Sequence, residues 1–132
     1  MTDRELWLAI QRHRAWCEGR PEGERVDLSG LDLRSRNMRE AVLQDASLMG
    51  SDLTGTTLEG ADLTNANLKD AILRDVNLRK AILVNADLSD VDFRGADLRG
   101  AIFDGADMWR CNMYDSIVAP DVLHKALGCR NV

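Results

Sequence analysis

A large apolar residue recurs at every fifth position through most of this 132-residue chain, and this period limits the possible folds more than any other feature. On an α-helix, five residues advance by about 140°, so these side chains would scatter around the helix instead of forming one buried stripe. In a straight strand, steps of five place successive side chains on opposite faces. Neither structure alone buries the whole set, so the chain must turn within each five residues.

The register runs without an insertion from Leu28 to Val118. Two residues before each large residue lies a small or short one, most often Ala, and Arg36 is the misfit at this position. A mostly polar residue separates the two. This small, middle, large order predicts a short extended piece whose small and large residues both face inward, while the middle residue faces outward.

The two residues after each large one form a corner. Gly or Asn often occupies the second corner position, which in a type II turn needs a positive φ. These residues are Gly30, Gly50, Gly55, Gly60, Asn65, Asn85, Gly95, Gly100 and Gly105. Elsewhere the same position holds Asp, Glu or Lys, as in Glu40 and Lys80, which suggests that other turn types are mixed in. Five residues therefore make one side of a coil, and the large residues stack along the axis of a solenoid.

The tandem A-[DN]-L-x-x pattern, as in ADLTNANLKDA and ADLRGAIFDGADM, resembles the pentapeptide repeat family over about residues 26–119. The resemblance implies an all-β solenoid, a right-handed quadrilateral β-helix with four pentapeptides to a coil and nearly five coils. At a strand spacing of about 4.8 Å, the tower would be roughly 20 to 25 Å tall.

The open ends of a solenoid expose apolar side chains and unpaired edges, so both ends require caps. We expect a capping helix and connector in residues 1–25, the β-helix in residues 26–119, and a short C-terminal capping helix and tail in residues 120–132. Thr2 to Glu5 reads as a capping box. One helical face then lies across the first coil and ends near Gly19. Its residues are Leu6, Ala9, Ile10, His13, Trp16 and Cys17.

No pattern in the chain indicates an enzyme, a cofactor or a metal site. His13 and His124 fall within the two expected capping helices, and no spacing pairs either with an acid or a nucleophile. The many Asp residues recur at the middle position, where we interpret them as solvated or turn-bonding side chains. Cys111 occupies an inward slot, so packing is its expected role, and a bridge from Cys111 to Cys129 stays open.

The chain has no run of about 18 apolar residues and no signal-peptide pattern at its start. We therefore expect a cytoplasmic protein that does not enter a membrane.

If a coil has four sides, positions twenty apart stack into columns and the outward residues sort into four faces. Face 1 is centred on Leu28, Leu48, Leu68, Leu88 and Met108. It is acidic. Its carboxylates are Asp27, Asp70, Asp87, Asp90 and Asp107.

Face 2 is centred on Leu33, Leu53, Leu73, Phe93 and Met113, and face 3 on Met38, Leu58, Leu78, Leu98 and Val118. Both carry arginines. Face 2 mixes them with aspartates, whereas face 3 is mixed to basic. These arginines are Arg34, Arg74 and Arg94 on face 2, and Arg39, Arg79 and Arg99 on face 3.

Face 4 is centred on Leu43, Leu63, Leu83 and Phe103, and it places apolar residues where solvent should be. They are Val42, Ile82, Val84 and Ile102. Such a strip is a candidate interaction face for a protein partner or a second copy, although Ile72 and Ile117 show that single apolar residues occur on other faces.

The leading interpretation is a non-enzymatic protein–protein interaction or scaffold module with an unidentified partner, no direct contact with nucleic acid and the possibility of a homodimer. The alternative follows from the resemblance: several members of the family are similar in shape and charge to B-DNA and bind DNA gyrase, protecting it from quinolones. Residues 26–119 hold 16 acidic and 10 basic side chains, a net charge of −6. Duplex DNA of similar height carries roughly 13 negative charges. The charge balance therefore favours the first interpretation over mimicry of DNA toward gyrase or topoisomerase, with face 1 as the surface that mimicry would use.

Overall fold

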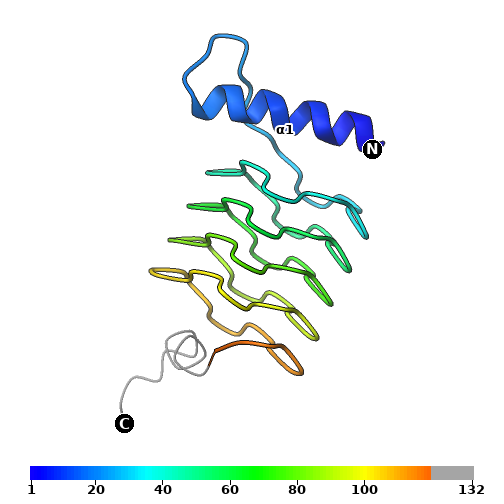
Figure 1. Ribbon diagram of the computed structural model, residues 1–132, viewed down its shortest axis with the longest axis vertical. Helices are drawn as coiled ribbons and strands as arrows, with labels where there is room; N and C mark the ends of the chain where they lie inside the picture. Colours follow the sequence, from blue (N-terminus) through cyan, green and yellow to red (C-terminus); the bar gives the residue numbers. More distant parts are fainter. Residues whose placement is uncertain (120–132) are drawn as a thin grey trace.

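The computed structural model describes residues 1–119, in which helix α1, Asp3–Cys17, lies across the N-terminal end of a stack of coils (Figure 1). Every β-bridge among the described residues is parallel and joins positions twenty apart, such as Asp27 with Ser47 and Ser47 with Asn67. Four pentapeptides therefore make one coil, and the fold is a quadrilateral β-helix.

The sides of the coils pair through isolated bridges, and residues 1–119 contain no longer strand. A corner after every three extended residues leaves room for a single bridging residue on each side. The coils are nevertheless bonded continuously: Leu48 N–H donates to Asn67 C=O at 2.7 Å, and Asn67 N–H donates to Ala46 C=O at 2.9 Å. Most backbone N–H and C=O groups of the coils therefore bond to the neighbouring coil, although no continuous strand forms.

The second corner residues all share one backbone sign, whichever residue type occupies them. The mixture of turn types stays a prediction, because type II and type I′ turns both have a positive φ at this position. The second corner residue has a positive φ at every corner from Gly30 to Asp115, including Glu40 at 57° and Lys80 at 60°. The cause is stacking, because each corner must superpose on the corner twenty residues away, as Lys80 does on Gly100 at 75°. A left-handed non-glycine residue costs roughly 1–2 kcal/mol, which packing along the stack must offset.

The large residues fill the tube as the register predicts. From Leu28 to Leu98 they are all at most 2% exposed, and Phe93 is the largest fully buried side chain. Burial decreases towards the other end of the described stack, where Met113 and Val118 are only partly buried against the core. The predicted C-terminal cap falls in residues 120–132, outside the described part of the chain.

Helix α1 begins with the predicted capping box, in which Thr2 and Glu5 exchange backbone and side-chain hydrogen bonds. On the predicted face Leu6, Ile10 and His13 are buried. Ala9 and Cys17 are partly buried, and Trp16 is 39% exposed.

Ala15 is also buried, although it lies off the predicted face of α1. The connector folds back over this side of the helix: Arg20 N–H donates to Ala15 C=O at 2.9 Å, and Glu24 N–H donates to Arg12 C=O at 3.0 Å. The helix is therefore covered from two sides, by the first coil and by its own connector.

Candidate interaction faces

His13 joins α1 to the first coil through both of its ring nitrogens. The ring is fully buried; Val26 N–H donates to Nδ1 at 2.9 Å, and Nε2 lies 2.7 Å from Gln44 C=O. Because Nδ1 accepts, Nε2 must carry the proton and donate. Further down the tower an equivalent carbonyl, that of Val84, accepts from the N–H of Asn65 in the coil before it. The imidazole therefore replaces the backbone donor that the first coil lacks, which is the structural role expected for a lone helical histidine.

Arg36, the misfit in the register, ties down the other end of α1. Its side chain is only 21% exposed; Nη1 forms an ion pair with Asp3 at 2.6 Å and Nη2 donates to Met1 C=O at 2.6 Å. An inward small position next to the open end of the tube has space for a long side chain that turns toward the cap. The exception in the repeat thus marks the second attachment point of the helix.

The pH dependence of stability should report the His13 contact. Burial lowers the pKa of His13 below 6.5. The charge of Arg25 lowers this pKa further, whereas the Gln44 carbonyl and Asp45 oppose the shift. The Cys17 thiol also contacts the ring. The neutral ring is therefore favoured in the folded state. Its contribution to stability is complete above pH 6.5 and is lost as the pH falls below 6.5 toward the lowered folded-state pKa.

We expect wild type to lose stability relative to His13→Gln when urea unfolding is compared at about pH 7.5 and about pH 5.5, because only wild type carries the depressed pKa. An unchanged difference between the two proteins would show that protonation of His13 is not linked to unfolding.

The middle Asp and Asn residues bond to the corner that follows them. In each case the side-chain oxygen accepts from the N–H two residues later, as Asp27 does from Ser29 at 3.0 Å and Asp107 does from Trp109 at 3.0 Å. This N–H has no backbone acceptor among the described residues, so the side chain supplies one. The interpretation of the recurring aspartates as turn-bonding groups is confirmed, and an apolar middle residue forgoes this bond.

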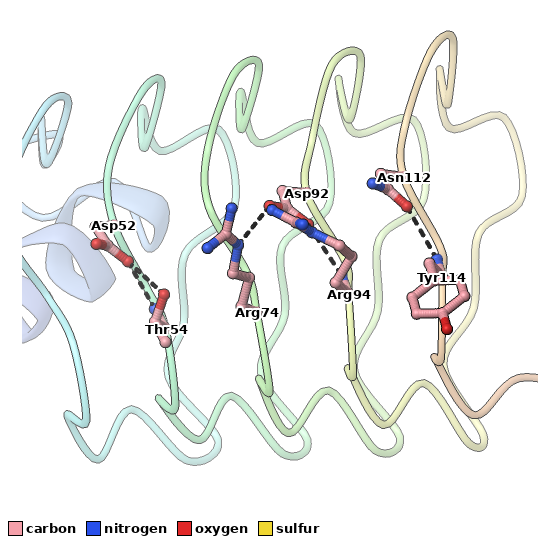
Figure 2. Close-up of polar contacts among 7 residues, drawn as sticks. All are labelled: Asp52, Thr54, Arg74, Asp92, Arg94, Asn112 and Tyr114. Carbon is pink, nitrogen blue, oxygen red and sulfur yellow. Dashed lines mark hydrogen bonds and ion pairs between the residues drawn. The ribbon is translucent and has the colours of Figure 1, made fainter.

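On faces 2 and 3 three of the middle aspartates, Asp32, Asp92 and Asp97, are paired with arginines. Figure 2 shows Asp92 between Arg74 and Arg94, with nitrogen–oxygen distances of 2.6 and 2.8 Å. Likewise Arg34 holds Asp32, lowering its pKa to about 2, and its hydrogen bonds outweigh the small effect of desolvation. Together the two faces hold eight acidic and eight basic residues within 26–119, so this half of the tower has no net charge.

Face 1 keeps its predicted carboxylates together. Asp27, Asp87 and Asp107 occupy one middle column, and Asp70 and Asp90 lie at the following corners. A hydrogen bond from Ser29 lowers the pKa of Asp27, which keeps it ionised. Two cations also belong to this face: Lys69, and Arg110, which lies 3.2 Å from Asp90.

Face 4 is the side on which apolar middle residues gather. Val42, Ile82 and Ile102 share a column, in which Ile82 and Ile102 are bridged neighbours, and Ile102 is 45% exposed. Val84 follows Ile82 at the corner and is half-buried. Three of the four middle positions on this face are apolar. By comparison, none of the five on face 1 is apolar, and one of five is apolar on each of faces 2 and 3. The concentration on one side distinguishes the strip from scattered surface residues.

The remaining middle position on face 4 is Asp62. Its place within the apolar strip was not predicted. It is bridged to Val42 on one side and to Ile82 on the other. The signal was present in the sequence, since position 62 lies twenty residues from both 42 and 82.

The family model for pentapeptide repeats, with eight copies, matches residues 27–65 and 71–110. The chain belongs to the pentapeptide repeat family. Proteins of this family fold as right-handed quadrilateral β-helices, in agreement with the stacking described above. No curated protein sequence matches this pentapeptide repeat protein significantly.

Solved structures of other pentapeptide repeat proteins share the fold. HetL of the cyanobacterium Nostoc sp. strain PCC 7120, a protein involved in heterocyst differentiation regulation, is 30% identical with a TM-score of 0.66. The match covers 70% of this chain but 44% of HetL, so the chain spans less than half of that protein. A pentapeptide repeat protein of the Arabidopsis thaliana thylakoid lumen is 25% identical with a TM-score of 0.59, over 79% of this chain and 74% of its own.

QnrB1, a plasmid-mediated fluoroquinolone resistance protein, matches 70% of this chain and 53% of its own length with a TM-score of 0.55. At 21% identity this likeness concerns the fold alone.

The other chemical groups of residues 1–119 point to no reactive site. Residues 1–119 contain no cluster of three or more His, Cys, Asp or Glu side chains suited to a metal ion. Burial raises the pKa of both Cys17 and Cys111, which disfavours the thiolate. Cys111 is packed against the core as expected, whereas Cys129 lies outside the described residues. Within the described chain, no helix has the length and apolarity that crossing a membrane requires.

Proposed function

We propose that this protein is a non-enzymatic interaction module that binds a protein partner through face 4, with Val42, Ile82, Val84 and Ile102 as the contact strip. The observation that carries the proposal is the clustering of apolar middle residues on this one face. Each of them forgoes the hydrogen bond that an Asp or Asn would make to the following corner, so the strip has a cost in the isolated tower. Burial against a partner would offset that cost.

The proposal agrees with the family, whose members are generally non-enzymatic structural or interaction modules. The tube is filled by its own side chains, which leaves the outer faces as the surfaces available for recognition. A second copy of this chain is one possible occupant of face 4.

A displayed library of random peptides tests the interaction face without knowledge of the natural partner. Selected binders should lose about tenfold or more in affinity for Ile82→Asp, because a charge is placed in the contact strip. They should bind Ile72→Asp normally, because Ile72 lies on face 2. Its AIL context is the same as that of Ile82, which makes it a matched control. Binders that tolerate both variants would place recognition elsewhere. Light scattering over a dilution series tests whether the partner is a second copy of this chain. In that case wild type forms a dimer, and Ile82→Asp is a monomer.

The second candidate is mimicry of DNA toward gyrase or topoisomerase, which face 1 would carry. Faces 1 and 4 together hold eight acidic and two basic residues within 26–119, so the negative charge is concentrated on half of the tower. The neutral half, with its exposed arginines, opposes entry into a surface built for DNA. We expect no change in supercoiling by gyrase when the protein is added, with or without a quinolone. The opposite result would be that the protein protects gyrase from the quinolone and that Asp87→Asn and Asp107→Asn abolish this protection. That result would favour mimicry.

A further inference from the structure

Asp62 places a fixed carboxylate inside the apolar strip of face 4. Its Oδ1 accepts from the Thr64 N–H at 3.0 Å and from the Thr64 hydroxyl at 2.7 Å, and its Oδ2 accepts from the Gln44 side chain at 2.5 Å. Burial raises the pKa of Asp62, but these hydrogen bonds outweigh it and leave the pKa lowered. The group is therefore an ionised, oriented acceptor with apolar neighbours on both sides.

The four sides of face 4 carry no cation of their own, and Arg25 of the connector reaches only their first corner, where its Nε donates to the Asp45 C=O at 2.7 Å. These five-residue sides, 41–45, 61–65, 81–85 and 101–105, contain Asp45, Asp62 and Asp104 and no Lys or Arg. The salt bridges of residues 1–119 do not include Asp62, whereas Asp32, Asp92 and Asp97 on faces 2 and 3 are each held by an arginine. Face 4 thus combines an apolar strip with carboxylates, Asp62 at its centre, that form no salt bridge within residues 1–119.

We propose that face 4 binds a cationic amphipathic α-helix of a partner protein, laid along the tower axis with a Lys or Arg directed at Asp62. This inference rests on the proposed function and names the chemistry of its partner. Apolar contacts would come from Val42 on one side of Asp62 and from Ile82 and Ile102 on the other, while Asp45 and Asp104 attract the flanking cations.

The spacing of the coils suits such a helix. Successive coils lie about 4.8 Å apart and successive turns of an α-helix about 5.4 Å apart. Apolar residues at helical positions i, i+3, i+4 and i+7 can therefore lie over consecutive coils, and a helix of about 14 residues spans a tower of roughly 20 Å. Packing of an apolar helix stripe on a sheet is a common way to bury both.

The experiment titrates the protein against an 18-residue fluorescein-labelled helical peptide, with Leu at helical spacing on one face, one Lys within that face to meet Asp62, and Lys on the remaining surface. Fluorescence anisotropy gives the affinity. We expect Asp62→Asn to weaken binding about fivefold and Ile82→Asp about tenfold or more, since one removes the charge pair and the other disrupts the apolar contact. Binding should also weaken when the salt concentration is raised.

The chain supplies a matched control for each variant. Asp52 on face 2 has the same DLT context as Asp62, and it accepts from Thr54 with the same distances of 3.0 and 2.7 Å. Ile72 has the same AIL context as Ile82. Asp52→Asn and Ile72→Asp should leave the affinity within about twofold, because neither lies on face 4. Circular dichroism of all four variants checks that each is folded, and we expect wild-type spectra.

Equal weakening by Asp52→Asn and Asp62→Asn would reduce the binding to diffuse attraction between a cationic peptide and an acidic protein, and would overturn the inference. A peptide with Glu in place of Lys that binds equally well would also overturn it. If the Lys peptide fails while displayed binders still depend on Ile82, the interaction face stands and only the cationic chemistry of its partner is rejected. If the displayed binders also ignore Ile82, the proposed function itself fails.

Discussion

Gly23→Ala is expected to lower the free energy of unfolding by about 3 kcal/mol, because the new methyl group meets backbone atoms that cannot rotate away. A Cβ at this position would overlap Trp16 N and Cα and the carbonyl carbon of Ala15, all in the main chain of α1. Gly23 thus lets the connector cross directly over the helix. The substitution should displace the connector and loosen the cap that it covers.

Urea unfolding followed by tryptophan fluorescence and by circular dichroism measures this effect, because Trp7 and Trp16 both lie on α1. Glu24→Ala is the neighbouring control; its side chain is exposed, so its stability should change by less than about 0.5 kcal/mol. A Gly23→Ala protein as stable as the control would mean that the connector shifts without cost.

The tower could be predicted from the sequence because its determinants are local and repeated. A register of five that continues from Leu28 to Val118 specifies which side chains point inward, and a corner after every large residue follows from it. The helix could also be predicted, because the capping box and the helical spacing of Leu6, Ile10 and His13 are signals within one short segment. Periodic patterns report structure whose contacts repeat.

Contacts between unlike segments could not be predicted in the same way. Nothing in the sequence pairs His13 with the carbonyl of Gln44, 31 residues away, or Arg36 with Asp3, 33 residues away. The positive φ at Lys80 could not be predicted from the residue itself either, because local preference disfavours it and the stacked corners impose it.

On the candidate site, the sequence assigned the apolar residues to one face, but the role of Asp62 within it was not predicted. Three hydrogen bonds make that carboxylate a fixed group, and one of them comes from Gln44, 18 residues away in the coil above. The stacked coils confirm that Val42, Asp62 and Ile82 form a continuous column, as their twenty-residue spacing implies. The column assignment specified which residues share a face, and the structure added how one of them is held.

Phe93→Ala should cause the largest loss of stability, about 3–5 kcal/mol, through the cavity it leaves inside the tube. Phe93 is fully buried, with Leu73 above it and Met113 below it in the same column. Since each coil contacts only its neighbours, a cavity at this level weakens the connection between the last coils and the rest of the tower. A loss of this size is a large fraction of the 5–15 kcal/mol that stabilises a typical domain.

Phe93→Leu is the matched control, because Leu occupies the same position at 33, 53 and 73 in the coils above. It should cost less than about 1.5 kcal/mol, since the replacement keeps most of the volume. Urea unfolding should then give two different signatures, a small shift for Leu and a large one for Ala. A broadened or two-step transition in Phe93→Ala would show the last coils unfolding separately, as expected for a stack held by nearest-neighbour contacts. Equal midpoints for the two variants would instead mean that the tube collapses around the cavity, and that the ring at position 93 contributes little beyond what a leucine provides.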